Sequence, residues 1–334
     1  QVVRQFGALV DSDWAPFDTP GSTRRFFAHW RPKVGVLVET EIWPNAIDVA
    51  SDQDIPMLLI NARMSARSAR GYSRVGRLTD FTLGKLTLVA AQTRADARRL
   101  VALGAKKECT IVTGSLKFEV NRNLLRKDWL CQKERLDRGI NGRPVWLAAS
   151  THQGEEEVVL DAFSALKAVC PNALLLLAPR HTVRTSKILS FPILRQWRVN
   201  LYSQLSRLSP KSDLLIIDTM GSLGGLTGYA DLVFVGGSLI PRGGHNPLEA
   251  ASWGVPILVG PHVRNFENIY RQLFIAQGAV KVEPEELTQR VVTLLGTDSG
   301  RQDAAEMGAR ARAYQVSERG SLDDLLKLLE RILC

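Results

Sequence analysis

The chain has 334 residues, a formal net charge of +9 and 45% hydrophobic residues. This composition excludes a disordered polypeptide and is typical of globular domains with apolar cores. No apolar run reaches the roughly 18 residues that predict a membrane-spanning helix, and the length suits two domains of ordinary size.

Basic charge is concentrated in the first part of the chain. Residues 1–142 contain 23 Lys and Arg against 15 Asp and Glu, whereas the remainder contains 20 against 19. A one-sided charge indicates that the first half meets an anionic partner, which could be nucleic acid, a phosphorylated substrate or a membrane surface. The cysteines form no Cys-x-x-Cys pair and no zinc spacing with histidine, which favours reduced thiols.

Short apolar runs alternate with helical patterns along the whole chain. Continuous apolar strands between helices are typical of parallel sheets buried on both faces, so the pattern predicts doubly wound α/β domains. Helices are predicted at Ala95–Leu103, Glu155–Val169 and Asn246–Trp253. The predicted strands are Val34–Val38, Met57–Ile60, Leu86–Ala91, Thr110–Val112, Val145–Ala149, Leu174–Ala178, Leu214–Ile217, Leu232–Val235 and Pro256–Val259.

A polar, charged segment interrupts this alternation at residues 123–142 and is predicted to be a linker. It separates a first domain, residues 1–122, from a second domain, residues 143–316. The tail, residues 317–334, predicts an amphipathic helix that packs across the domain seam. Two such domains around one linker form a cleft between the carboxyl ends of their strands, where this kind of fold binds ligands.

Polar or glycine-rich loops follow five of the predicted strands. Their sequences are ETEIWPN, TGSLKF, PRH, DTMGSLGG and GGSLIPRGGHNPLE. Because the carboxyl ends of parallel strands meet at one sheet edge, these loops predict a binding site there. Neither GxxxxGK[ST] nor GxGxxG after a strand occurs, which disfavours ATPase and dehydrogenase functions.

The Asn-Pro-Leu-Glu segment of the fifth loop has two interpretations. Asn246 suits an N-cap, Pro247 suits the first helical position, and Glu249 suits the reciprocal position of a capping box. Alternatively, Glu249 accepts hydrogen bonds from ribose hydroxyls while the helix N-terminus faces a phosphate. In this second interpretation, four glycines let a ligand approach the backbone: Gly236, Gly237, Gly243 and Gly244.

The histidines give weaker signals than the loops that contain them. His181 and His245 follow basic residues at predicted strand ends and are candidates for phosphate contacts. His152 is interpreted as a residue that orients a loop, His262 as a turn residue, and His29 as structural.

Five arginines recur at spacings of 4, 3, 4 and 3, which predicts that they share one helical face. They are Arg63, Arg67, Arg70, Arg74 and Arg77. No acidic residue neutralises this stretch. The stripe is either a solvated face or a surface that binds an anionic lipid or a phosphorylated acceptor, and Gly71 and Gly76 predict that part of it is loop.

Taken together, these motifs resemble the 3-deoxy-D-manno-octulosonic acid (Kdo) transferases, which move Kdo from CMP-Kdo onto the lipid A precursor. The matching segments run in order from about Val34 to Asn268: ETEIWPN, NARMSARSARGY, AAQT, ALGA, TGSLKF, ASTHQGEE, PRH, DTMG and ADLVFVGGSLIPRGGHNPLEAASWGVPILVGPH. The resemblance implies two Rossmann-like domains facing across a cleft (GT-B), with the acceptor on the first domain and the nucleotide on the second. It also implies inverting, metal-independent transfer in lipopolysaccharide biosynthesis, without a cofactor.

The resemblance further assigns individual residues of this chain. Glu39 and Lys117 match positions that stabilise the transition state, and the family often has Glu where this chain has Ser222, which bears on nucleotide preference. The matches to the CMP-contacting segments are Pro179, Arg180, Met220, Gly221, Ser222, Asn246, Pro247, Leu248 and Glu249.

The family's general base is a Glu in a Ser-Val-Gly-Glu segment upstream of ETEIWPN. No such segment occurs in this sequence, so we expect the general-base Glu to be absent from this chain. We also expect the membrane-anchoring N-terminus and the first βα units to be missing, which would leave the first domain incomplete.

The expected partners are CMP-Kdo, a phosphorylated lipid A precursor and an anionic membrane surface contacted by Arg63, Arg67 and Arg70. The expected location is the cytoplasmic face of the inner membrane, held peripherally or through the missing N-terminus, or a mitochondrial membrane in a plant. One alternative is another GT-B transferase that uses a UDP-sugar. A second is a non-catalytic module that binds nucleic acid, but no nucleic acid is expected because aromatic residues do not alternate with the arginines.

Overall fold

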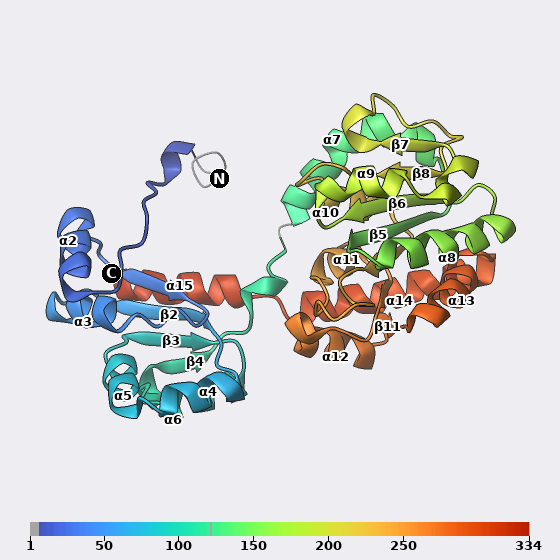
Figure 1. The fold of residues 1–334 in the computed structure, drawn as a ribbon. Helices are drawn as coiled ribbons and strands as arrows, with labels where there is room; N and C mark the ends of the chain where they lie inside the picture. The colour runs from blue at the N-terminus through green and yellow to red at the C-terminus, as the bar shows by residue number, and fades with distance from the viewer. Residues whose placement is uncertain (1–6, 121, 334) are drawn as a thin grey trace. The chain divides into compact units, whose positions relative to one another are not determined.

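The computed structural model describes residues 7–120 and 122–333, and these residues divide into two α/β units (Figure 1). Unit 1 comprises Gln1–Glu119 and Glu318–Cys334, and unit 2 comprises Val120–Ser317. Each unit is built on its own parallel sheet. Among the described residues, no helix combines the length and apolar character that crossing a bilayer requires.

Unit 1 has a four-stranded parallel sheet in the order β1-β2-β3-β4. The strands are β1 (Gly35–Val38), β2 (Met57–Ala62), β3 (Leu88–Ala91) and β4 (Thr110–Val112). The helices are α2 (Pro20–Trp30), α3 (Pro44–Asp52), α4 (Ala66–Ser73), α5 (Gly76–Gly84), α6 (Arg94–Ala102) and α15 (Ser321–Leu333).

The inner strands of this sheet are apolar on both faces, as expected for strands covered by helices on two sides. Leu58 and Leu59 on successive positions of β2 are both fully buried. The outer strand β1 alternates instead, and its Val36 and Val38 remain 41% and 44% exposed. Helices α3, α5 and α6 contribute Ile47, Leu83 and Leu100 to the core of the unit.

Unit 2 has a seven-stranded parallel sheet in the order β11-β10-β9-β5-β6-β8-β7. The strands are β5 (Val145–Thr151), β6 (Leu174–Pro179), β7 (Val199–Leu201), β8 (Leu214–Ile216), β9 (Leu232–Val235), β10 (Ile257–Val259) and β11 (Ala279–Lys281). The helices are α7 (Arg122–Ile140), α8 (Glu155–Val169), α9 (Thr185–Leu189), α10 (Leu223–Leu226), α11 (Leu248–Trp253), α12 (Glu267–Ile275), α13 (Pro284–Leu295) and α14 (Asp298–Ser317).

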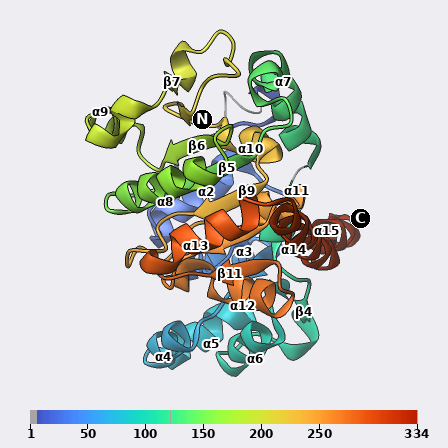
Figure 2. The same ribbon diagram turned by 90° about the vertical axis from the view of Figure 1, so that its right-hand side faces the viewer.

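Large aromatic side chains fill the core of unit 2. Helices α8 and α13 pack side by side over one face of the sheet (Figure 2). Between them and the strands, Trp146, Phe163 and Phe234 are fully buried. Aromatic side chains of this size dominate the apolar area that a core removes from water, so the sheet of unit 2 is a rigid platform for the loops at its edges.

The order of strands creates a reversal point in unit 2. From β5 the chain builds outward through β6 to β8 and β7, and then returns to the opposite side of β5 as β9. In doubly wound sheets the loops at such a reversal diverge and leave a crevice at the carboxyl ends, where ligands bind. The carboxyl ends of β5 and β9 therefore define the position to inspect for a site.

The prediction of doubly wound α/β domains is confirmed, and each of the nine predicted strands is present. Two short strands, β7 and β11, were not predicted. They lie at the two edges of the seven-stranded sheet, where a strand needs less apolar sequence because only one side is paired.

The segment predicted as a linker, residues 123–142, differs in the structure. It lies mostly within helix α7, which packs against α10 and belongs to unit 2. Leu136 is fully buried, and Arg135 donates to the carbonyl oxygens of Tyr202 and Leu205 at 2.8 and 2.5 Å. The charges that suggested a linker are the solvent face of a helix and anchors to a neighbouring loop.

The C-terminal helix α15 groups with unit 1. The Glu119 carboxylate accepts hydrogen bonds from the backbone of Gly320 and Leu322, at 2.7 and 3.4 Å, just where α15 begins. An acidic side chain at a helix N-terminus also interacts favourably with the helix dipole. The packing of the tail across the domain seam stays a prediction.

The unit boundaries change the distribution of charge expected from the sequence. Unit 1 contains 20 Lys and Arg against 16 Asp and Glu, and unit 2 contains 23 against 18. The net charges are therefore +4 and +5, since the basic helix α7 belongs to unit 2. The expectation that the first domain alone carries the basic charge was wrong.

Candidate active site

The loops of unit 1 bring Glu39 and Lys117 together, although they follow strands on opposite edges of the sheet. Glu39 comes directly after β1, and Lys117 lies in a 3₁₀ turn (Leu116–Phe118) after β4. Lys117 Nζ is 3.9 Å from Glu39 Oε1, and both side chains are partly exposed. The two residues matched to transition-state stabilisation are thus neighbours.

The chain after β4 reaches β1 by running back along the carboxyl edge of the sheet. Thr113 donates its backbone N–H to Ala91 at the end of β3, and Leu116 donates to Asn61 Oδ1 at the end of β2, at 3.1 Å in both cases. Asn61 is buried, so this hydrogen bond lies in a protected environment. These bonds fix the backbone of the turn that carries Lys117.

Backbone strain accompanies this arrangement. Glu39 has φ of 62° and Asn61 has φ of 49°, both in the left-handed region that costs a non-glycine residue about 1–3 kcal/mol. Hydrogen bonds hold the strained turn, since Glu39 N donates to Ile60 O at 3.0 Å and Arg63 N donates to Glu39 O at 3.4 Å. Strain of this kind clusters at functional sites.

In unit 2, the Glu155 carboxylate joins the loops that follow β5 and β9. It is fully buried at the start of α8 and accepts four backbone N–H bonds. The donors are His152 and Gly237 to Oε2, at 2.9 and 2.7 Å, and Ser238 and Leu239 to Oε1, both at 2.9 Å. The bond to His152 is local, whereas the three bonds to the loop after β9 link residues more than 80 positions apart and have no signal in the sequence.

The glycines of the loop after β9 serve the protein's own packing. A Cβ at Gly236 would lie 2.5 Å from the carbonyl oxygen of Ser150, and one at Gly243 would lie 2.7 Å from Asn265 Oδ1. Gly237, with φ of 68°, leaves room for the ring of His245, 3.0 Å from a built Cβ. The expectation that these glycines are there to admit a ligand therefore gives way to a structural reason.

The capping-box interpretation of the Asn-Pro-Leu-Glu segment was wrong. Helix α11 begins at Leu248, and Asn246 Oδ1 accepts a hydrogen bond from Leu248 N at 3.0 Å in a local turn. Within the described part of the chain, the Glu249 carboxylate has no hydrogen bond to the backbone of Asn246 or to any other group. Burial raises the pKa of Glu249, and it is the sole cause found.

Glu249 lies beside a second segment matched to CMP contacts. Its Oε2 would be 3.9 Å from a Cβ at Gly224, two residues after Ser222. Ser222 is held by its hydroxyl, 3.1 Å from the Thr219 hydroxyl, and by Gln132, which donates to its carbonyl oxygen at 3.2 Å. Two loops, after β8 and after β9, thus meet around an unpartnered carboxylate.

The remaining CMP-matched residues differ in what they can present. Arg180 and Met220 are exposed, the latter by 71%, whereas the side chains of Leu248 and Pro247 are buried. Leu248 can therefore contact a ligand only through its backbone. Gly221 has φ of 88°, a conformation that favours glycine, and Pro179 ends β6.

Three histidines from three strand ends converge at the reversal point of unit 2, which the sequence did not predict. His152 follows β5, His181 follows β6, and His245 lies in the loop after β9. The Nε2 atoms of His152 and His245 are 2.9 Å apart, and their rings are parallel, with an interplanar angle of 2°. The His181 ring meets His152 edge-on at 5.7 Å between centroids.

The environment favours the neutral form of this pair. Burial, followed by the neighbouring His152, Arg180 and His181, lowers the pKa of His245 to about 4. Burial also lowers the pKa of His152, against the opposing effect of Glu155. Within residues 7–120 and 122–333, no group of three or more His, Cys, Asp or Glu side chains is placed to hold a metal ion.

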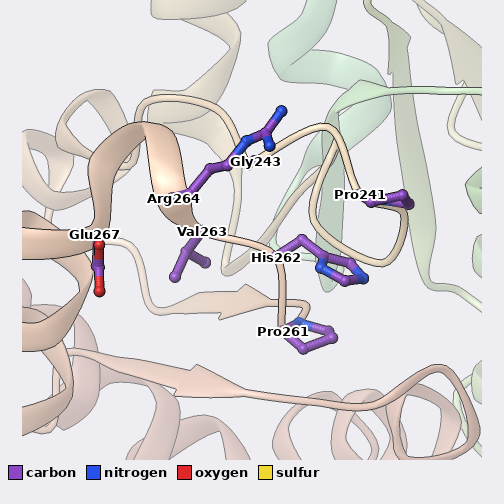
Figure 3. Close-up of a pocket in the computed structure, with 7 residues that line it drawn as sticks. All are labelled: Pro241, Gly243, Pro261, His262, Val263, Arg264 and Glu267. Atoms are coloured by element: carbon purple, nitrogen blue, oxygen red, sulfur yellow. The ribbon is translucent and has the colours of Figure 1, made fainter. Parts of the chain in front are cut away.

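A cavity of about 280 Å³ lies beside the loop after β9, which contains Gly243 (Figure 3). Its walls come from the loops after β9 and β10, and none of the residues matched to CMP contacts lines it. The lining residues are Pro241, Gly243, Pro261, His262, Val263, Arg264 and Glu267.

Comparison with known proteins places this geometry in a family. A family model described as 3-Deoxy-D-manno-octulosonic-acid transferase (kdotransferase) matches residues 1–120. The 3-deoxy-D-manno-octulosonic acid transferase of Haemophilus influenzae is 36% identical over 342 residues, covering 100% of this chain and 77% of that protein.

Two solved structures share the fold. The C-terminal CMP-Kdo binding domain of WaaA from Acinetobacter baumannii aligns with 57% of this chain over 98% of its own length, with a TM-score of 0.50 and 22% sequence identity. The UDP-GlcNAc 2-epimerase of Neisseria meningitidis covers 93% of this chain and 80% of its own, with a TM-score of 0.58 and 15% identity.

A fold of two Rossmann-like units is that of the GT-B class of glycosyltransferases and related sugar-nucleotide enzymes. Within this class, the chain belongs to the 3-deoxy-D-manno-octulosonic acid transferase family. It is thus a Kdo-type glycosyltransferase by family.

Proposed function

We propose that this chain transfers Kdo from CMP-Kdo to a phosphorylated lipid A precursor, with inversion at the sugar and without a metal ion. The observation that carries this proposal is the state of Glu249. The Glu249 side chain is partly buried, burial raises its pKa, no hydrogen bond to its carboxylate is found among the described residues, and it lies between two loops at a sheet edge, where a ligand can donate to it. The hydroxyls of a ribose provide suitable donors.

The CMP moiety would occupy the carboxyl edge of unit 2. Glu249 accepts from the ribose, and the backbone around Met220, Gly221 and Ser222 borders the nucleotide. Asn246, Pro247 and Leu248 contribute the N-terminal turn of α11, and Pro179 fixes the end of β6 so that Arg180 faces the phosphate. This arrangement accounts for the positions of all nine matched residues with the chemistry each can present.

Transfer requires that negative charge on the departing phosphate be neutralised as its bond to the sugar breaks. Arg180 is the cation of unit 2 proposed for this role, and within unit 1 Glu39 positions Lys117 through the 3.9 Å ion pair. Because both side chains of this ion pair are partly exposed, the pair contributes little to the stability of the fold, and its role is to orient Lys117. The acceptor hydroxyl attacks the sugar carbon, and a base removes its proton.

The acceptor side is proposed to lie on unit 1, at Arg63, Arg67 and Arg70. All three side chains are exposed, and none forms an ion pair within the described residues. They lie before and within helix α4, and the next helix, α5, exposes Leu78 and Phe81 by 51% and 54%. Basic and apolar groups on neighbouring short helices suit attachment to an anionic membrane surface, here the cytoplasmic face of the inner membrane.

Calorimetric titration with CMP, UMP and AMP tests the donor assignment. We expect CMP to bind most tightly, and replacement of Glu249 by Gln to weaken it roughly 10- to 100-fold, because hydrogen bonds to a charged group are worth about 1.5–3 kcal/mol. Glu157→Gln, an exposed residue on the same unit, is the matched control. Equal affinity for the three nucleotides would contradict the proposal.

A further inference from the structure

The histidine cluster of unit 2 lies within the chain segments assigned to the donor but has no role in the proposed function. His181 directly follows Arg180, and His245 directly precedes Asn246. The cluster lies at the reversal point between β5 and β9, where a doubly wound sheet holds the phosphate of its ligand. Its chemistry should therefore bear on an anion.

The hydrogen bond between His152 and His245 limits how many protons the pair can hold. In a bond between two Nε2 atoms, one nitrogen carries the hydrogen and the other accepts it. The donor ring can bind one more proton at its Nδ1, and the bond then becomes charge-assisted and stronger. A second added proton would place two N–H groups against each other, so the pair has capacity for one.

The groups around the pair explain why it is neutral in the free protein. Arg180, Arg242 and the ring of His181 oppose an added positive charge, and both histidines are partly buried. Glu155 is the one acidic neighbour, but its carboxylate is already occupied by four backbone N–H groups. An incoming phosphate would reverse this balance, because it adds negative charge next to an otherwise cationic cluster.

The loops are rigid enough for the pair to act as a unit. Glu155 bonds to the backbone of His152 and of Gly237–Leu239, so it fixes the two loops that carry the rings. On the other side, Tyr270 donates its hydroxyl to the carbonyl oxygen of His245 at 2.9 Å. Hydrogen bonds therefore hold the backbone on which each of the two rings is carried.

We propose that the His152–His245 pair takes up one proton when a nucleotide phosphate binds, and that the resulting imidazolium is part of the phosphate site. This inference rests on the proposed function, because it takes CMP as the ligand. The pair stays hydrogen-bonded throughout, with the ring of His181 packed edge-on against His152. Donor binding is thereby linked to pH through a site formed by three strand ends.

Proton counting by calorimetry tests the proposal. CMP is titrated into the whole chain at pH 7.0 in three buffers with different heats of ionisation, and the slope of the heat gives protons bound per CMP. We expect an uptake above about half a proton. A phosphate group with a second pKa near 6 is about nine-tenths dianionic at pH 7, so CMP itself can release only about a tenth of a proton.

Variants assign the proton to the pair. His152→Gln and His245→Gln should each reduce uptake to near zero and weaken CMP binding about tenfold, whereas His262→Gln, which lines the separate cavity, should retain full uptake. The series on the unaltered chain decides the matter even if a variant fails to fold.

The possible outcomes distinguish a failure of this inference from a failure of the proposed function. If CMP binds but fewer than about 0.2 protons are taken up, the inference is wrong while the donor assignment stands. Uptake that persists in both histidine variants also overturns it. If CMP does not bind at all, the proposed function fails first, and the inference fails with it.

Discussion

Two glutamates of unit 2 differ in how far the protein itself satisfies the carboxylate with hydrogen bonds. Glu155 is fully buried and accepts four backbone N–H bonds, so its charge is satisfied inside the protein. Glu249 is only partly buried, no hydrogen bond to its carboxylate is found in the described residues, and burial raises its pKa. The Glu155 carboxylate therefore stabilises the fold, whereas the Glu249 carboxylate is left available to a hydrogen-bond donor from outside the protein.

Replacing Glu249 with Gln should therefore change stability and binding in opposite directions. A raised folded-state pKa means that the ionised form is destabilised by folding, so a neutral side chain of the same shape removes that cost at pH 7. We expect the free energy of unfolding to rise by roughly 0.5–2 kcal/mol while CMP binding weakens. Denaturant melts at pH 7 measure the first effect, and a loss of stability would contradict the account.

Replacing Glu155 with Gln should destabilise unit 2. The amide nitrogen of Gln would face backbone N–H donors, leaving up to two of the four bonds unmade at about 1–3 kcal/mol for each group left unsatisfied. We expect a loss of roughly 3 kcal/mol in denaturant melts. Glu157→Gln, exposed on the same helix turn, should change little, and equal effects from the two substitutions would rule out the proposed role.

The histidine pair should make stability depend on pH in a defined window. The folded-state pKa of His245 is about 4 against 6.5 for the free side chain, so between these values the unfolded chain binds a proton that the folded chain does not. Stability should therefore fall as pH drops from about 6.5 toward 4. Melts of the native chain and His245→Gln at pH 7.5 and 5.0 should show a smaller loss in the variant, and identical losses would refute this.

At the scale of elements, the loop after β4 shows why the contact between Glu39 and Lys117 could not be predicted from their positions in the sequence. Glu39 and Lys117 follow strands on opposite edges of a four-stranded sheet, and nothing in their spacing indicates contact. The contact depends on Asn61, whose buried side chain accepts from Leu116 across 55 positions of sequence. Long-range side-chain bonds of this kind have no local sequence signal.

The strands, by contrast, were predictable because their signal is local. Runs such as those around Leu58 and Leu176 are apolar on both faces, and each of the nine predicted strands exists. Helix α7 was not predicted, because its polar surface resembles a linker and few of its described residues, among them Leu136 and Gln132, are buried. The histidine cluster was also missed, since its three members lie on separate loops and only the strand order brings them together.

The local sequence pattern predicted only part of the structure of the arginine stripe of unit 1. Its spacing predicts one helical face, but α4 ends at Ser73 and α5 begins at Gly76, so the stripe spans a loop and two short helices. The break agrees with the prediction, made from Gly71 and Gly76, that part of the stripe is loop. The side chains nevertheless remain exposed.

Neutralising part of the stripe should weaken binding to anionic vesicles. Each Arg near such a surface contributes about 1 kcal/mol, so replacing Arg63, Arg67 and Arg70 with Gln should reduce partition by roughly 100-fold. Liposome sedimentation measures this effect. The matched control replaces three exposed arginines of unit 2 with Gln: Arg195, Arg207 and Arg290. This control lowers the net charge by the same amount, and it should reduce vesicle binding much less. Equal losses would contradict a specific surface.

For the whole molecule, the two units carry nearly equal net charge, so charge alone does not distinguish a proposed acceptor side from a proposed donor side. The carboxyl edges of the two sheets differ instead: unit 1 has a Glu–Lys pair on strained backbone, and unit 2 has a partly buried carboxylate and a histidine cluster. That the general base lies outside residues 1–334 stays a prediction.

The central claim is that CMP binds at the carboxyl edge of unit 2 through loops after β6, β8 and β9. Hydrogen–deuterium exchange of the whole chain with and without saturating CMP tests it most directly. We predict slowed exchange in residues 180–181, 219–225 and 243–249 together, because a bound nucleotide shields these backbone amides from solvent. Protection confined to the loops of the separate cavity, residues 261–267, or absent from all three segments, would contradict the account.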